Sequence, residues 1–363
     1  RGGNLMAGLD DPLYAMQWPM RIYKLDRKGK PVAWEEGIRP KSLLGKGGKQ
    51  FPIKSQPAHI SAVPVSETGL PHGMGIRGDG HIFIFAAAHC GNRPPKSLHE
   101  YLPTGKQLTD NPIIWKVSDA AVGPRFDAQG NIYVAEYVRP KGRHYPDELV
   151  KALGPMKKRE NDGLRREAAS MYGSILKFGP TGGMVHIPAD KKVPEPYRGT
   201  PKLDASMNTI SAEYFSRGDL HPVKVTGAEW MRFGVSHIGV QSCTCENITF
   251  DVDEFGRVFH PDTNRYRVTV LDTAGNEIAH FGNYGNAESC GPDSPVVDPK
   301  TGKVRPRKPG EKLESPFAKP EIAFSWLVGV GATDKYIYCG DSINRRMLRL
   351  KLTYAAEETV PVQ

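Results

Sequence analysis

The residue types best suited to chemistry gather in one short stretch, at His237, Cys243, Cys245 and Glu246. Imidazole and thiolate groups are common zinc ligands, but a structural zinc site needs four of them at proper distances. The chain has no second CxC or CxxC, and two thiols one residue apart are poorly placed to bond each other. Three readings stay open: a metal site, a disulfide or plain buried thiols, or a loop that contacts a partner protein.

The cysteine count adds one constraint. The five residues are Cys90, Cys243, Cys245, Cys290 and Cys339. An odd number cannot pair completely within one chain, and Cys90 and Cys290 are the candidate disulfide partners of the loop. The count neither requires nor excludes an oxidising compartment.

Several common catalytic signatures are missing from the chain. It has no Gly-rich phosphate loop, no GxSxG nucleophile elbow and no HExxH metal motif. It also lacks CxxCH, so the sequence predicts no covalently bound haem. No catalytic residue is therefore assigned from motifs, and the identity of any bound metal is left unknown.

A repeated hairpin must position whatever chemistry the chain performs. A short apolar strand, a tight turn with Gly and a strand rich in aromatic and β-branched residues recur at 75–84, 126–134, 250–259 and 330–338. Further hairpins are predicted at 20–34, 174–187 and 265–281, because each has alternating runs around a Gly-containing turn. Hairpins repeated along a chain indicate an architecture that stacks one unit many times.

One stretch contains a complete unit, with strands at 248–252, 257–260, 265–271 and 277–282. Four antiparallel strands of this length are typical of one blade of a β-propeller. The sequence therefore predicts an all-β, closed β-propeller formed by residues 1–363 as a single domain. At about 50 residues per blade, seven blades are favoured and six are an alternative. We expect the N-terminal strand to complete the C-terminal blade, which leaves no exposed edge.

Long interruptions separate the predicted blades. They span 36–70, 90–112, 138–171, 190–225 and 287–325, and each follows a second or a fourth strand. In an up-and-down blade these strand ends lie on the same side of the ring. We therefore expect one face to carry the long insertions, where binding function is common, and the opposite face to be nearly bare.

Histidines and acidic residues fall at the predicted strand ends. His72, His89, His237 and His260 could contribute to a metal site in a central channel, but a histidine near a strand end is more commonly structural. Asp251 and Asp253 resemble a carboxylate pair, although turn capping is the simpler role for an Asp that starts a turn. Asp residues recur in the similar turns at Asp79, Asp127 and Asp334.

Charge and hydropathy exclude some classes of protein. The net charge is +9, but the basic residues are dispersed in loops without a nucleic-acid-binding motif, so we expect no nucleic-acid partner. No run reaches the roughly 18 apolar residues of a membrane span. The chain begins at Arg1, which fits removal of an export signal, and we expect an exported protein.

Two phrases resemble NHL-type propeller repeats. One is 126–135, which matches the strand pair of that family, and the other is 340–349, which matches its following strand. Asp262-Thr263-Asn264-Arg265-Tyr266-Arg267-Val268 matches the second half again. This resemblance implies a fold rather than an activity.

The segments 124–126, 171–178 and Cys243-x-Cys245 leading into 250–253 resemble a narrower group, the propeller (beta) subunits of hydrazine synthase from anammox planctomycetes. That resemblance implies a non-catalytic subunit of an oxidoreductase complex in nitrogen metabolism, located in a periplasm-like compartment or the anammoxosome lumen. Haem would lie on partner subunits, which would form hydrazine from nitric oxide and ammonium. The chain itself would hold no covalent cofactor, with a structural calcium ion as an option. His237, Cys243, Cys245 and Glu246 would then form a partner-contact loop.

Two alternatives belong to other functional classes. One is an independent lactonase-like or lyase-like propeller enzyme that uses a metal in the central channel. The other is an extracellular carbohydrate- or protein-binding propeller, although the tryptophans that would serve such a surface lie mostly in strand-like runs.

Overall fold

The computed structural model describes most of the strands and the shorter turns of the chain. The described residues are 4–8, 12–17, 21–35, 42–44, 50–52, 59–61, 73–87, 96–108, 111–118, 121–143, 172–188, 200–216, 219–236, 248–286, 296–298, 300–301, 303–311 and 320–353. Their secondary structure is β-strand, apart from one short 3-10 helix. The chain divides into two compact units, residues 1–248 with 273–276, and residues 249–272 with 277–363.

The first unit begins with an antiparallel sheet in the order β1-β2-β3-β4, with β7 also paired to β3. Its strands are β1 (Asn4–Ala7), β2 (Leu13–Gln17), β3 (Arg21–Leu25), β4 (Pro31–Val32) and β7 (His59–Ser61). The hairpin predicted at 20–34 is thus confirmed as β3 and β4. A separate two-stranded sheet is formed by β5 (Ser42–Leu44) and β6 (Gln50–Pro52).

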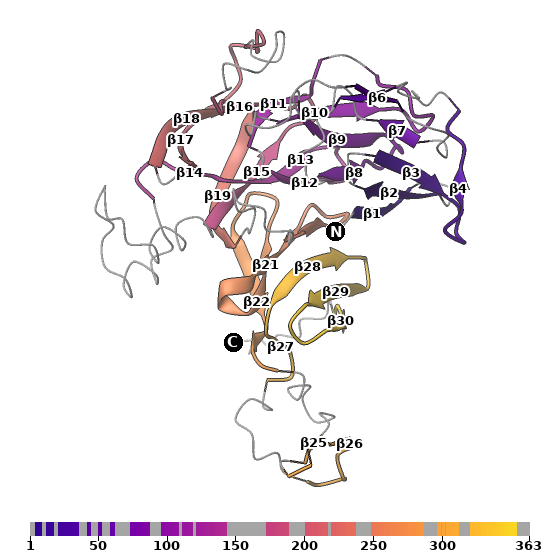
Figure 1. Ribbon diagram of the computed structural model, residues 1–363. Helices are drawn as coiled ribbons and strands as arrows, with labels where there is room; N and C mark the ends of the chain where they lie inside the picture. Colours follow the sequence, from indigo (N-terminus) through magenta and orange to yellow (C-terminus); the bar gives the residue numbers. More distant parts are fainter. Residues whose placement is uncertain are drawn as a thin grey trace, which may run out of the picture. The chain divides into compact units, whose positions relative to one another are not determined.

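A second sheet of the first unit has the order β8-β9-β10-β11-β16-β18-β17-β14 (Figure 1). Its strands are β8 (Met74–Ile76), β9 (Ile82–Ala87), β10 (Lys96–Tyr101), β11 (Ile114–Val117), β16 (Gly183–Val185), β18 (Asp219–Thr226), β17 (Thr209–Ser216) and β14 (Val138–Pro140). The first four form a consecutive antiparallel blade. The parallel pairing of β11 with β16 then extends this blade into the β17–β18 hairpin.

The third sheet is a four-stranded antiparallel blade in the order β12-β13-β15-β19. Its strands are β12 (Val122–Phe126), β13 (Ile132–Glu136), β15 (Tyr172–Phe178) and β19 (Ala228–Ser236). The first strand of this blade, β12, lies beside β8, which in turn lies beside β1. Gly75 permits this close approach, because a Cβ there would lie 2.9 Å from Pro124 Cγ and 3.0 Å from the Phe126 ring.

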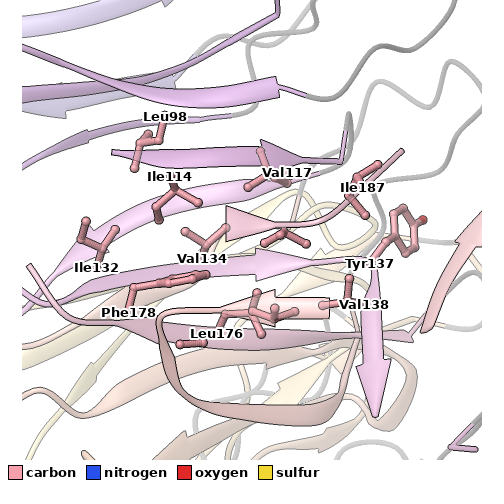
Figure 2. Close-up of a cluster of buried hydrophobic side chains, with 14 of the residues drawn as sticks. Leu98, Ile114, Val117, Ile132, Val134, Tyr137, Val138, Leu176, Phe178 and Ile187 are labelled. Atoms are coloured by element: carbon pink, nitrogen blue, oxygen red, sulfur yellow. The ribbon is translucent and has the colours of Figure 1, made fainter. Parts of the chain in front are cut away.

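The largest core of the first unit lies between the second and third sheets. Figure 2 shows Leu98 and Ile114 of the second sheet above Ile132, Val134 and Phe178 of the third. Every side chain of β13 and β15 is buried. Strands covered on both faces carry continuous apolar runs instead of strict alternation, which is the pattern that the sequence shows at 132–135.

The second unit contains the blade β20-β21-β22-β23 and the three-stranded sheet β28-β29-β30. Their bounds are β20 (Asp251–Val252), β21 (Val258–Asp262), β22 (Arg267–Leu271), β23 (Glu277–Phe281), β28 (Leu327–Ala332), β29 (Tyr336–Asp341) and β30 (Arg346–Lys351). The remaining elements are the 3-10 helix η2 (Thr263–Arg265), β24 (Asn283–Tyr284), β25 (Val296–Val297), β26 (Val304–Arg305) and β27 (Ala323–Phe324). Thr249, just before β20, forms a parallel bridge with Gly329 of β28.

Four-stranded antiparallel sheets in sequence order, with the first strands of successive sheets side by side, are the pattern of a β-propeller. The predicted all-β propeller class is therefore confirmed, as are the four strands predicted between 248 and 282. The number of blades stays a prediction. So do the single domain spanning 1–363 and the completion of the last blade by the N-terminal strand.

Two features of the predicted strand map are wrong. The hairpin expected at 174–187 does not form, because β15 pairs with β19 while β16 pairs with β11 and β18. Gly182 and Gly183 let the chain cross between sheets at this point, since a Cβ on either would collide with the backbone of Ile113 or Thr226. In addition, all the stretches expected to be insertions contain strands: β5, β6 and β7 in 36–70, β10 in 90–112, β14 in 138–171, β17 and most of β18 in 190–225, and β25, β26 and β27 in 287–325. Strand β10 was not expected because two of its buried side chains, His99 and Glu100, are polar and interrupt the apolar pattern of a buried strand.

Candidate functional site

Asp127 and Asp253 have the turn-capping role that the sequence favours. Asp251 instead accepts the N–H of Ala332 at 2.8 Å, and in the last of the similar turns the N–H groups of Lys335 and Tyr336 bond to Thr333. Oδ1 of Asp127 accepts the backbone N–H groups of Gln129 and Asn131 at 3.1 and 2.9 Å. Asp253 accepts those of Phe255 and Arg257 at 3.1 and 2.8 Å. The carboxylates of Asp127 and Asp253 therefore satisfy the donors of their own turns, and these residues are structural.

Carboxylates also stand at the end of the second strand in three blades, and they too accept hydrogen bonds from nearby groups. Buried Glu136 accepts bonds from the backbone N–H and the hydroxyl of Ser118. Buried Asp341 accepts the N–H groups of Ser325 and Trp326, both at 3.0 Å. Asp262 accepts the guanidinium groups of Arg265 and Arg267 at 2.9 and 3.2 Å.

A different cluster stands at the β8–β9 turn, which we call the Arg77 cluster: Arg77, Asp79, His81 and Glu100. Nη2 of Arg77 lies 2.7 Å from Asp79 Oδ2 and 2.8 Å from Glu100 Oε1. The same Glu100 oxygen lies 2.7 Å from Nδ1 of His81. The imidazole thus has one nitrogen held by a carboxylate, while its Nε2 bonds to no residue in the described part of the chain.

The strand register explains how this cluster forms. Phe83 of β9 pairs with Glu100 of β10, so His81, two residues before Phe83 on the same face, lies diagonal to Glu100. The side chain of Arg77 lies across the ring of Phe83, 4.9 Å from the centroid. A guanidinium held over an aromatic ring and between two carboxylates has a fixed position.

The electrostatics of the Arg77 cluster follow from these contacts. Burial opposes the charge of Arg77, but its bond to Asp79 and the charges of Glu100 and Asp79 outweigh burial and raise the Arg77 pKa. Burial likewise opposes ionisation of Asp79, yet the bonds from Arg77 and from the His81 N–H lower the Asp79 pKa below its usual range. Arg77 and Asp79 are therefore both charged at neutral pH.

A groove of about 540 Å³ opens beside the cluster, and we call it the turn-face groove. It lies among the short turns of the first two blades, and its lining residues come from both of them: Pro12, Tyr14, Lys24, Leu25, Asp26, Arg27, Val32, Asp79, Gly80 and Pro103. Asp79 belongs to both the groove and the cluster. The face of short turns, expected from the sequence to be nearly bare, therefore carries this groove.

An aromatic pair stands at the turn-face groove, where Tyr14 is one of the lining residues. The ring of buried Tyr14 stacks on Trp34 with the centroids 5.5 Å apart. Nζ of Lys24 lies 5.8 Å from the Trp34 centroid and 3.8 Å from Glu35. Burial, and then the charge of Glu35, raise the Tyr14 pKa, so its hydroxyl stays protonated and can donate a hydrogen bond.

The site residues expected from the sequence, His237, Cys243, Cys245 and Glu246, lie outside the described residues, and the partner-contact loop stays a prediction. The other expected positions that fall outside them are His72, His89, Cys90 and Cys290. His260 is described and is structural: it is buried, with Nδ1 3.4 Å from the carbonyl of Pro261.

The described residues form no metal site. No group of three or more His, Cys, Asp or Glu side chains there could hold a metal ion. The buried carboxylates at the second-strand ends have their oxygens engaged by amides and guanidinium groups, so they do not fit a metal-ligand role. The structural calcium option stays a prediction. Among the same residues, no helix is long and apolar enough to cross a membrane.

Arg77, His81 and Glu100 were not recognised from the sequence as residues that act together. In the first predicted hairpin, Arg77-Gly78-Asp79-Gly80-His81 has the pattern of a tight turn, and this pattern does not reveal the contact with Glu100. A dense run of charged residues in an otherwise glycine-rich turn was the available signal. Its partner Glu100 lies in a strand that the sequence did not reveal.

Comparison with family models gives no match, and comparison with curated proteins gives none either. Among the solved structures that resemble the chain are three β-propellers. A gluconolactonase from Xanthomonas campestris has a TM-score of 0.35 and 10% identity, covering 93% of this chain and 69% of that one. The calcium-binding protein regucalcin from Agrobacterium tumefaciens has a TM-score of 0.30 and 12% identity, covering 78% and 61%. A PQQ-bound aldose sugar dehydrogenase from Streptomyces coelicolor has a TM-score of 0.37 and 12% identity, covering 99% and 85%.

These comparisons correct the function expected from the narrower resemblance. The proteins named are a lactonase, a calcium-binding protein and a sugar dehydrogenase. The prediction of a non-catalytic hydrazine synthase subunit is therefore wrong.

Proposed function

We propose that the chain is a propeller enzyme that hydrolyses a small polar cyclic ester, such as a sugar lactone, in the turn-face groove. The observation that carries this proposal is the His81–Glu100 pair, with its 2.7 Å contact, beside a groove of about 540 Å³. A volume in this range accommodates a small-molecule ligand. Two of the proteins of similar structure are a gluconolactonase and an aldose sugar dehydrogenase.

The roles follow from the geometry of the Arg77 cluster. Glu100 accepts the Nδ1–H of His81 and so fixes the tautomer in which Nε2 carries the lone pair. Nε2 can then take a proton from water while the water oxygen attacks the ester carbonyl. Collapse of the tetrahedral intermediate breaks the bond to the ring oxygen, which receives the proton, and a hydroxy acid is formed.

The groove positions the substrate, and Arg77 positions the catalytic pair. Arg77 touches both Glu100 and Asp79, so it acts through them as a positioning residue. Lys24 and Arg27 line the groove and place positive charge where the developing oxyanion and the product carboxylate need it. The carboxylates of Asp26 and Asp79 face the same groove and can accept bonds from substrate hydroxyl groups.

The test is hydrolysis of δ-gluconolactone by the purified full chain, followed with a pH indicator. Replacing the base in His81→Gln is expected to lower kcat/KM by about 100-fold or more, with Glu100→Gln lowering it through loss of the fixed tautomer. His280→Gln is the matched control, because His280 also contacts a glutamate, Glu277, at 3.1 Å but is exposed. Equal rates for His81→Gln and His280→Gln, or no turnover of any sugar lactone by the unaltered chain, would refute the proposal.

A further inference from the structure

A second group of polar residues, separate from the turn-face groove, begins with an unusual backbone conformation in β11. Lys116 has a φ of 54°, in the left-handed region. Here Trp115 and Lys116 of β11 stand opposite the single residue Ser97 of β10, which is a β-bulge. Bulges redirect side chains, and a left-handed residue with a Cβ persists only where its surroundings impose it. The fold therefore fixes the position of the Lys116 side chain, which is only 8% exposed.

The residues after β16 bring a histidine to the same place. The backbone N–H of Ile187 donates to the carbonyl of Lys116 at 3.3 Å, and that of His186 donates to the carbonyl of Lys224 at 2.9 Å. Val185 pairs with Val225 in antiparallel register, so His186 and Lys224 stand opposite each other on one side of the sheet. Three basic residues from three adjacent segments thus converge.

A chain of hydroxyl groups fixes the histidine ring. Nε2 of His186 lies 3.0 Å from Oγ1 of Thr226, which lies 3.1 Å from Oγ1 of Thr209. This uses one ring nitrogen. Nδ1 of His186 has no hydrogen-bond partner in the part of the chain that the structure describes.

The charges that act on this ring are positive. Burial first, and then the charges of Lys116 and Lys224, lower the pKa of His186. On the facing strand β17 the acidic residue of this side is Glu213, and its carboxylate already accepts the N–H of Gly142 at 3.2 Å. The ring is therefore neutral without a ligand, in a local field that favours an anion.

We infer that Lys116, His186, Lys224 and Thr226 form a binding site for a phosphate group. Two ammonium groups match the two negative charges of a phosphate monoester or of inorganic phosphate. The hydroxyl of Thr226 and a protonated Nδ1 of His186 add directional donors for a tetrahedral oxyanion. Phosphate binding offsets the field of the two lysines, so His186 takes up a proton as the anion binds.

The test uses the full-length chain and inorganic phosphate. Calorimetry measures the dissociation constant, and NMR of the histidine imidazoles follows protonation of His186. We expect saturable binding, a rise of the His186 pKa with phosphate, and binding of acetate at least tenfold weaker because acetate has a single charge. The lactonase assay above does not measure this site, so the two proposals succeed or fail separately.

Variants locate the binding. Lys224→Gln changes an exposed residue and is expected to weaken phosphate binding by about tenfold, the loss of one charge-assisted contact. Lys202→Gln, at another exposed lysine of the same unit, is the matched control and is expected to have no effect. Lys116→Gln is expected to act like Lys224→Gln, and Lys224→Gln decides the question if the Lys116 variant does not fold. Absence of saturable binding, equal effects of Lys224→Gln and Lys202→Gln, or a His186 pKa unmoved by phosphate would overturn the inference.

Discussion

The capping carboxylate of the β12–β13 turn provides the sharpest test of how the repeated hairpins are stabilised. Asp127 is 6% exposed. Besides two turn N–H groups, it accepts the side-chain N–H of Asn131 at 2.8 Å and the hydroxyl of Tyr133 at 3.0 Å. The perturbation is Asp127→Ala, and the matched control is Asp26→Ala in the β3–β4 turn.

The expected magnitudes follow from what each carboxylate holds. Asp26 accepts the N–H groups of Lys28 and Lys30 at 2.8 and 2.9 Å in an exposed turn. Water can replace it there, so Asp26→Ala is expected to cost about 1 kcal/mol. Asp127→Ala loses the same two bonds and also deprives the fully buried Tyr133 hydroxyl of this acceptor, at about 1–3 kcal/mol. We therefore expect a total of about 3 kcal/mol.

The assay is urea unfolding followed by tryptophan fluorescence, to which Trp230 contributes through its edge contact with Tyr133 at 6.0 Å. The slope of the free energy against urea is expected to be unchanged. In a Tyr133→Phe background, Asp127→Ala is expected to cost about 1–2 kcal/mol less. If Asp127→Ala and Asp26→Ala agree within about 0.5 kcal/mol, the buried carboxylate contributes no more than a surface turn, and the reasoning fails.

Two further predictions concern packing and titration. Gly75→Ala places a Cβ against the carbonyl of Pro124 and is expected to destabilise the chain by about 1–3 kcal/mol in thermal unfolding, whereas Gly78→Ala, which meets open space, is expected to have little effect. Burial raises the pKa of the Cys339 thiol to about 12, so above roughly pH 8.5 the unfolded chain loses a proton that the folded chain keeps. Stability is therefore expected to fall as the pH rises toward 12, with a gentler fall in Cys339→Ala; parallel stability curves for the two proteins would contradict this.

Local sequence patterns predicted the elements whose partners are close in the chain. The blade between 251 and 281 was predictable because short turns at Asp253 and Gly275 join strands with obvious apolar residues. The capping roles of Asp127 and Asp253 were predictable for the same reason, since each carboxylate bonds to amides two and four residues ahead.

Features that depend on distant residues were not predictable. The turn-face groove takes its walls from two blades, and the pairing of His81 with Glu100 depends on the register of β9 and β10. Strand β16 leaves its expected hairpin because Gly182 and Gly183 tolerate a close backbone crossing. Nothing in a single sequence records such an approach, since glycine serves equally well in an ordinary turn.

The buried carboxylates at the second-strand ends have a consequence for how this chain tolerates change. Glu136 accepts a hydrogen bond from Ser118, just before β12, and Asp341 accepts hydrogen bonds from Ser325 and Trp326, just before β28. Each of these two sheets is thereby bonded to the segment that leads into it, and this bond fixes where the first strand begins, whatever precedes the segment in the chain. We therefore expect the connections between sheets to tolerate changes in length during evolution. A foreign peptide inserted before such a bonded segment is likewise expected to leave the strands that follow it undisturbed.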